Sequence, residues 1–315
     1  MGRKDDLTKS YMRNPEIFAD FFNGLIYDGA EQIDWKELRE IDSTFLLNAP
    51  NSGRGKSRTE QRYRDIIKKA IIMSAGDAYY VIFGIENQSD IHYAMPVRNM
   101  LYDALAYHDQ VQEIARANKV DSSKAASSEE FLSGITPYDK LMPVITVTIY
   151  WGKDSWIAPT SLKSMLQLYD EKLEKYINDY NINLFSIIDL KDIPKYKTEL
   201  NELFSILNMR NDGAGMKAVV SANEKFKHIS RETAEIMRDF TSIKLPRKQK
   251  EGDYNMCKAV MEIKDEGRAE GRAERDNDFV KAIKNLMDNT KKSFDEACFL
   301  MGISEEDKKR YRSLM

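Results

Sequence analysis

The stretch that decides the fold is residues 79–88, YYVIFGIENQ. Its first five residues are all aromatic or β-branched, which is the composition of a buried β-strand. Strand side chains alternate between the two faces of a sheet, so Glu86 and Gln88 point to the same side, about 6 to 7 Å apart along the backbone. The stretch therefore predicts a buried strand that carries one carboxylate and one amide to its end.

A second segment, residues 66–73, is expected to pair with residues 78–85 as a hairpin, because residues 74–77 (SAGD) have the small and polar composition of a turn. The midpoint between Asp65 and Glu86 falls inside this turn, so the register places the two acids opposite each other. Facing side chains of antiparallel strands lie within about 5 Å, where two like charges destabilise the pair. A divalent cation between them would remove the repulsion.

Two other interpretations of these residues stay open. The apolar residues of this segment also recur at the spacing of one helix face: Tyr63, Ile66, Ile67, Ala70 and Ile71. The segment could then be an amphipathic helix with Asp65 on its solvent-facing side. Glu86 and Gln88 could equally be solvated residues at the point where a core strand leaves the sheet.

Several blocks outside this pair occur in an order that is found in one family: residues 64–67 (RDII), 84–89 (GIENQS), 93–103 (YAMPVRNMLYD), 142–145 (MPVI) and 150–152 (YWG). Together they resemble the recombination-promoting nuclease/putative transposase family of the PD-(D/E)XK nuclease superfamily. The resemblance runs from Lys4 to Leu168. It resumes at residues 266–273, EGRAEGRA, which are similar to the Glu- and Gly-rich repeats of these proteins.

The resemblance implies catalytic roles for three residues. Asp65 and Glu86 would be the metal ligands, and Gln88 would stand in the position of the superfamily lysine. An amide can orient water but brings no positive charge, so more of the activation falls on the metal. Hard oxygen ligands favour Mg2+ or Mn2+ over zinc. The superfamily glutamate on the preceding helix has no clear counterpart, and Asp20 is its one weak candidate.

Charge bears on the expected partner, DNA. Lys and Arg number 48 against 51 Asp and Glu, so local rather than net charge must attract a nucleic acid. Basic residues crowd the approach to Asp65, and we expect phosphate contacts from Arg54, Lys56, Arg62, Arg64 and Lys68. A solvated basic loop is the alternative.

Arg98 falls in the first turn of a helix expected at residues 94–115, where unpaired backbone N–H groups could help to bind a phosphate. It could instead pair with Glu86 or Asp103.

Composition limits the class of protein. The chain has 315 residues with 42% hydrophobic, enough for a folded core with appendages. Its two cysteines, Cys257 and Cys298, are far apart and lack zinc-ligand spacing. The amino terminus is polar, and no apolar run approaches the ~18 residues of a membrane span. We therefore expect a cytoplasmic protein without a membrane partner.

The expected fold is an α/β, restriction-endonuclease-like core over residues 1–190, in which helices flank a mixed sheet that includes a strand at residues 144–150. A helical extension would follow at residues 191–250. Residues 251–315 would form a helical tail with the EGRA repeat and a small terminal module, in which Gly302 ends one helix and Ser304 begins the next. Each glycine of the repeat costs a helix about 1 kcal/mol against alanine. The repeat is thus expected as a solvated spacer, with self-association into a homo-oligomer as the alternative.

These features predict a Mg2+-dependent DNA endonuclease, which the resemblance links to recombination, mobile elements or defence. Two rivals remain. One is a catalytically silent protein that keeps the nuclease fold for binding or assembly. The other is a nuclease that acts on RNA or on branched DNA, because the same metal chemistry would serve it.

Overall fold

The structure is a computed structural model, and it describes residues 2–41, 44–48, 59–63, 65–74, 77–120, 128–167, 170–241, 243 and 253–315. It divides into two compact units, Met1–Tyr254 and Asn255–Met315. Within the part of the chain so described, no helix combines the length and the apolar character that crossing a bilayer requires.

The first unit combines helices with two sheets. Its strands are β1 (Arg39–Glu40), β2 (Thr44–Asn48), β3 (Thr59–Tyr63), β4 (Ile66–Ser74), β5 (Asp77–Gln88), β6 (Val144–Tyr150) and β7 (Asn183–Ser186). Its helices are α1 (Arg3–Arg13), α2 (Pro15–Tyr27), α3 (Met95–Val120), α4 (Ser128–Ser133), α5 (Glu171–Glu174), α6 (Leu200–Asn208), α7 (Gly213–Ala222) and α8 (Arg231–Phe240).

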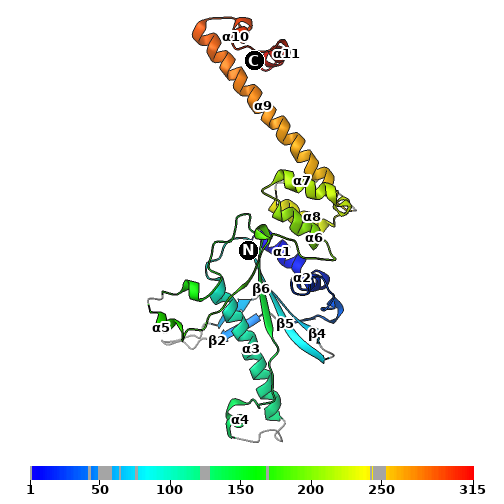
Figure 1. The fold of residues 1–315 in the computed structure, drawn as a ribbon, viewed down its shortest axis with the longest axis vertical. Coiled ribbons are helices and arrows are strands. Elements are labelled where there is room, and N and C mark those ends of the chain that lie inside the picture. Colours follow the sequence, from blue (N-terminus) through cyan, green and yellow to red (C-terminus); the bar gives the residue numbers. More distant parts are fainter. Residues whose placement is uncertain are drawn as a thin grey trace. The chain divides into compact units, whose positions relative to one another are not determined.

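The main sheet has the strand order β1-β4-β5-β6-β7. β4 is antiparallel to β1 and β5, whereas β6 is parallel to β5 and β7. A parallel neighbour needs a long crossover connection, and α3 lies in the one between β5 and β6 (Figure 1). The expected α/β fold with a mixed sheet and flanking helices is confirmed.

The predicted hairpin is confirmed in its register. Ile66 pairs with Ile85 and Ser74 with Asp77, so the next position along places Asp65 opposite Glu86. The helical alternative for this segment is wrong because nine consecutive residues of β4 pair with β5. β1 pairs with the other edge of β4, and its Glu40 lies opposite Lys68.

Alternation along β5 sends neighbouring side chains to two different helical layers. Phe83 packs against Phe22 of α2, with ring centroids 4.5 Å apart. Ile82, on the other face, joins Ile67 and Tyr102 of α3 in one buried cluster. Even-numbered residues of β5 thus face α3, and this parity includes Glu86 and Gln88.

Several helices begin after a residue whose side chain caps them. Asn14 precedes α2, and its side chain accepts a hydrogen bond from the Glu16 N–H at 3.0 Å, with Pro15 as the first helical residue. Between β6 and β7 the chain forms a short 3-10 turn, Lys163–Met165.

The second unit consists of α9 (Met256–Thr290), α10 (Phe294–Leu300) and α11 (Glu305–Arg312). Its core is formed by Val280, Ile283, Ala297, Cys298 and Tyr311. Gly302, with φ +66°, follows α10, and the Ser304 side chain caps α11 by accepting the Asp307 N–H. The predicted break between these two helices is confirmed.

Candidate active site at the ends of the central strands

Asp65 and Glu86 meet at the end of the β4–β5 hairpin. The backbone N–H of Asp65 points to Glu86 Oε1 at 3.4 Å. Asp65 is 9% exposed and Glu86 is fully buried. Buried carboxylates at facing positions of two strands repel each other, and each needs a positive partner or a cation.

Each acid has a cationic partner from a different helix. Lys9 Nζ of α1 lies 2.9 Å from Asp65 Oδ1, and Arg98 Nη2 of α3 lies 3.1 Å from Glu86 Oε2. Burial opposes the charge on Arg98, but the Glu86 carboxylate and Tyr102 outweigh it, so the pKa of Arg98 lies above its ordinary value. Of the two partners that the sequence offered for Arg98, the structure selects Glu86.

Asn87, near the end of β5, forms hydrogen bonds both to Asp65 before β4 and to Trp151 after β6. Its backbone N–H donates to Asp65 Oδ2 at 2.9 Å, and its side-chain Oδ1 accepts the Trp151 Nε1–H, also at 2.9 Å. Trp151 follows β6 directly and is fully buried. This chain of contacts fixes the carboxylate of Asp65 relative to both central strands.

A hollow of about 220 Å³ opens beside these acids. Asp65, Gln88 and Arg98 line it, together with the segment that follows β5 and with Asp5 and Lys9 of α1. Gln88 is partly exposed here, whereas Glu86 is fully buried and is not one of the lining residues. The hollow thus offers solvent access to Asp65 and to the amide that the resemblance places in the lysine position.

Sequence reasoning missed the contribution of α1. Asp5 accepts a hydrogen bond from Ser89 Oγ at 2.7 Å, and Lys9 contacts Asp65. The two residues are four apart and share a helix face, which the sequence does reveal. That this face meets the end of β5, more than 50 residues away, depends on the tertiary fold.

The chain matches one family model over residues 4–211, described as "Putative transposase, YhgA-like". The protein belongs to this family. No curated protein and no solved structure matches the chain at a significant level. The description of the family indicates a mobile-element function and an interaction with DNA, and it agrees with the resemblance drawn from the sequence blocks.

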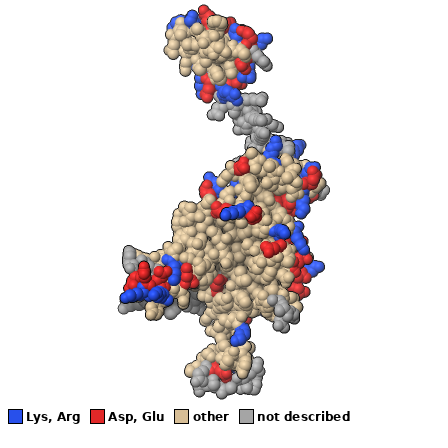
Figure 2. All heavy atoms as spheres, viewed as in Figure 1, with Lys and Arg blue, Asp and Glu red and all other residues tan. Residues whose placement is uncertain are grey.

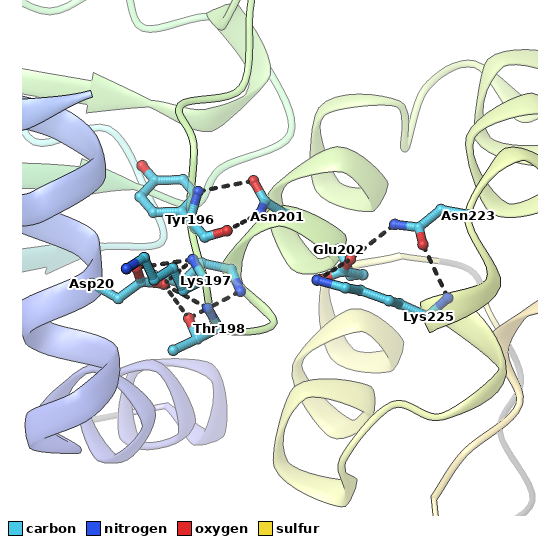
Figure 3. Close-up of polar contacts among 9 residues, drawn as sticks. Asp20, Tyr196, Lys197, Thr198, Asn201, Glu202, Asn223 and Lys225 are labelled. Atoms are coloured by element: carbon cyan, nitrogen blue, oxygen red, sulfur yellow. Dashed lines mark hydrogen bonds and ion pairs between the residues drawn. The ribbon is translucent and has the colours of Figure 1, made fainter. Parts of the chain in front are cut away.

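Asp20 does not line the hollow, and its side chain binds another part of the fold. Its carboxylate accepts the Lys197 N–H at 3.0 Å, the Thr198 N–H at 2.8 Å and the Thr198 hydroxyl at 2.6 Å (Figure 3). These contacts join α2 to the segment before α6. Asp20 is therefore a structural residue, and Asp5 is the acid that the first two helices bring to the hollow.

The predicted phosphate contacts have different outcomes. Arg54, Lys56 and Arg64 lie outside the described residues, and Arg62 is described only as part of β3. Lys68 is wrongly assigned: its side chain is 1% exposed, and its ammonium donates to the Arg13 carbonyl at 2.8 Å. The reason is alternation, because Lys68 is three residues from Asp65 and so points to the opposite face of the sheet.

On the face shown in Figure 2, charge does not mark a single surface for DNA. Figure 2 shows acidic and basic side chains intermixed on the face in view, with large areas that carry neither. This agrees with the near balance of charges along the chain. Any attraction for DNA must come from local groups of side chains.

The donor atoms at this site fit Mg2+ or Mn2+ in kind. Carboxylate and amide oxygens are hard ligands, and Mg2+ is commonly held by one or two carboxylates together with substrate phosphates and water. No cluster of three or more His, Cys, Asp or Glu with a metal-binding arrangement occurs among the described residues. Asp65 and Glu86 would hold the ion, and the remaining ligands would have to come from the substrate and water.

Proposed function

We propose that this protein is a metal-dependent endonuclease that hydrolyses phosphodiester bonds of DNA. The observation that carries the proposal is the juxtaposition of Asp65 and Glu86, brought from two strands to one point beside an open hollow. The family's link to mobile elements supports DNA as the substrate.

In the proposed mechanism, Asp65 and Glu86 would hold Mg2+ or Mn2+. Such an ion, when bound, lowers the pKa of its water and offsets the charge of the phosphate. Gln88 orients the attacking water through its amide. Lys9, beside Asp65, supplies the positive charge that an amide lacks. Arg98 fixes the Glu86 carboxylate and also lines the hollow, where it can face the phosphate.

A specific observation favours one rival. The two carboxylates are already neutralised by Lys9 and Arg98, an arrangement that a catalytically silent binding protein could keep for stability alone. In that case the fold would serve to bind DNA or to assemble, and the acids would be dispensable for what the protein does in cells.

The decisive experiment is cleavage of supercoiled plasmid by purified protein in Mg2+, in Mn2+ and in chelator. We expect nicking that requires metal in the wild type. In Asp65→Asn and Glu86→Gln the rate should fall by more than about 100-fold, because even outer partners of a metal site are typically worth 10- to 100-fold.

Asp109→Asn is the matched control, since Asp109 is an exposed carboxylate of the same α3 that carries Arg98. It should cleave like the wild type. Equal nicking by all four proteins would contradict the proposal, and so would wild-type nicking that persists in chelator.

A further inference from the structure

A second hollow, of about 340 Å³, lies next to the proposed cleavage site. The segment Ser89, Asp90 and Ile91, directly after β5, lines both hollows. The second hollow is completed by Lys4, by Lys153 and Arg210, and by the buried Trp151. The two hollows are therefore neighbours that share one loop.

The two hollows differ in the charges that line them. Three acids and two bases line the cleavage hollow: Asp5, Asp65, Asp90, Lys9 and Arg98. The second hollow has the reverse balance, with Lys4, Lys153 and Arg210 against Asp90 and Asp154. An excess of acids suits a divalent cation, and an excess of bases suits the phosphodiester backbone of a nucleic acid.

Arg210 shapes this second hollow. It donates from Nη1 to the Trp151 carbonyl at 2.7 Å and from Nη2 to the Gly152 carbonyl. A side chain at position 152 would collide with the ring of Tyr150, so only glycine permits this close path. Burial lowers the pKa of Arg210 below its ordinary value. Arg210 thus holds the loop after β6 in place and adds a fixed positive charge to the hollow's wall.

Lys4 and Lys153 are the residues available to a ligand. Both are exposed, and neither forms an ion pair with any residue that the structure describes. Lys4 Nζ lies 4.9 Å from the centroid of the Phe240 ring, which orients the ammonium at the rim. Two unpaired ammonium groups at the edge of a hollow are suited to hold phosphate oxygens.

α1 connects the two hollows. It contributes Lys4 to the second and Lys9 to the first, and the Asp5 contact with Ser89 ties the helix to their shared loop. Lys4 and Lys9 are five residues apart, about 7.5 Å along the helix axis, which is comparable to the rise of about two nucleotides of one DNA strand. Lys4 and Lys9 are thus spaced so that they can reach phosphates of one strand about two nucleotides apart.

We propose that the second hollow binds the backbone of the DNA strand one or two nucleotides from the cleaved bond, with Lys4 and Lys153 as the phosphate contacts. This rests on the proposed function for the identity of the first hollow. The shared Ser89–Ile91 loop then lies beneath the strand, between the two phosphates.

The test is the affinity for a short fluorescent duplex, measured by anisotropy in chelator over a series of salt concentrations, so that no cleavage is required. In the double variant Lys4→Ala/Lys153→Ala we expect an affinity loss of about tenfold per lysine near 0.1 M salt. The slope of log K against log salt should become shallower by about 2, or about 1 per lysine.

Lys172→Ala/Lys175→Ala is the matched control, because it removes two exposed lysines at α5, which lines neither hollow. It should bind like the wild type. Equal losses in both double variants would overturn the inference, as would unchanged binding by Lys4→Ala/Lys153→Ala or no duplex binding by the wild type. Binding is measured in chelator, so it does not depend on cleavage. Absence of plasmid cleavage would therefore refute the proposed function without deciding whether the second hollow binds DNA.

Discussion

At the scale of single residues, Lys9 decides what chemistry the two acids can support. Its ammonium is 2.9 Å from Asp65, whereas Gln88 offers an uncharged amide on the same side of the sheet as Glu86. A positive charge beside Asp65 both opposes the binding of a second cation and stabilises negative charge on water or phosphate. Its removal should therefore act on these two properties in opposite directions.

Lys9→Met is expected to bind Mg2+ more tightly, seen as a lower Mg2+ concentration at half-maximal cleavage, while the maximal rate falls by about 100-fold. A purely structural role for Lys9 would not produce this split. Lys36→Met, which removes an exposed lysine of the first unit, is the control and should leave both quantities unchanged. A normal maximal rate in Lys9→Met would refute the role of Lys9.

Much of this residue-scale geometry could be predicted from the sequence. The turn composition of residues 74–77 fixed the register, and the register placed Asp65 opposite Glu86. The same alternation sends Lys68 to the opposite face of the sheet, which the expected phosphate contact from Lys68 did not take into account. Lys9 and Asp5 could not be found in this way, because local periodicity carries no information about which strand end α1 will meet.

At the scale of elements, α3 controls where Arg98 lies. One face of this helix is tied to β6 and its neighbours by polar contacts: Asn99 to Thr148, Asp103 to Thr146 and Tyr180, Tyr107 to the Val144 N–H, and Gln110 to Met142. The helix itself could be predicted from its sequence. Its polar face could not, because these residues look like ordinary solvated positions until the sheet is placed against them.

Asp103→Ala should lower the free energy of unfolding by about 3 to 6 kcal/mol, because two hydroxyl groups lose a charged acceptor and each such bond contributes about 1.5 to 3 kcal/mol. Urea unfolding followed by tryptophan fluorescence measures the loss. Cleavage should fall as well, since Arg98 stands on the same helix. Asp109→Ala, on the exposed side of α3, should change stability by less than about 0.5 kcal/mol; equal losses in the two variants would contradict the assigned role of Asp103.

At the scale of the whole molecule, the chain forms two units that each have their own core. The end of α10 and the start of α11 followed from Gly302 and Ser304, since caps are local signals. The EGRA repeat lies within the continuous helix α9, despite the glycines, but side chains at residues 261–274 are outside the description. Self-association through this region stays a prediction.

Ile283→Ala tests whether the second unit has an independent core. Ile283 is fully buried there, and its truncation should cost about 2 to 5 kcal/mol. All three tryptophans, Trp35, Trp151 and Trp156, belong to the first unit. The helical signal in circular dichroism should therefore melt earlier, while the tryptophan-detected transition keeps its midpoint. A parallel shift of both signals would contradict two separate cores.

The central claim is that Asp65 and Glu86 share one divalent cation, and direct Mn2+ binding tests it most closely. Calorimetric titration of the wild type, Asp65→Asn, Glu86→Gln and Asp109→Asn at low salt gives the number of ions bound by each. We predict a site in the wild type and in Asp109→Asn that is lost in both of the other variants. The same Mn2+ binding in all four proteins, or none in the wild type, would contradict it.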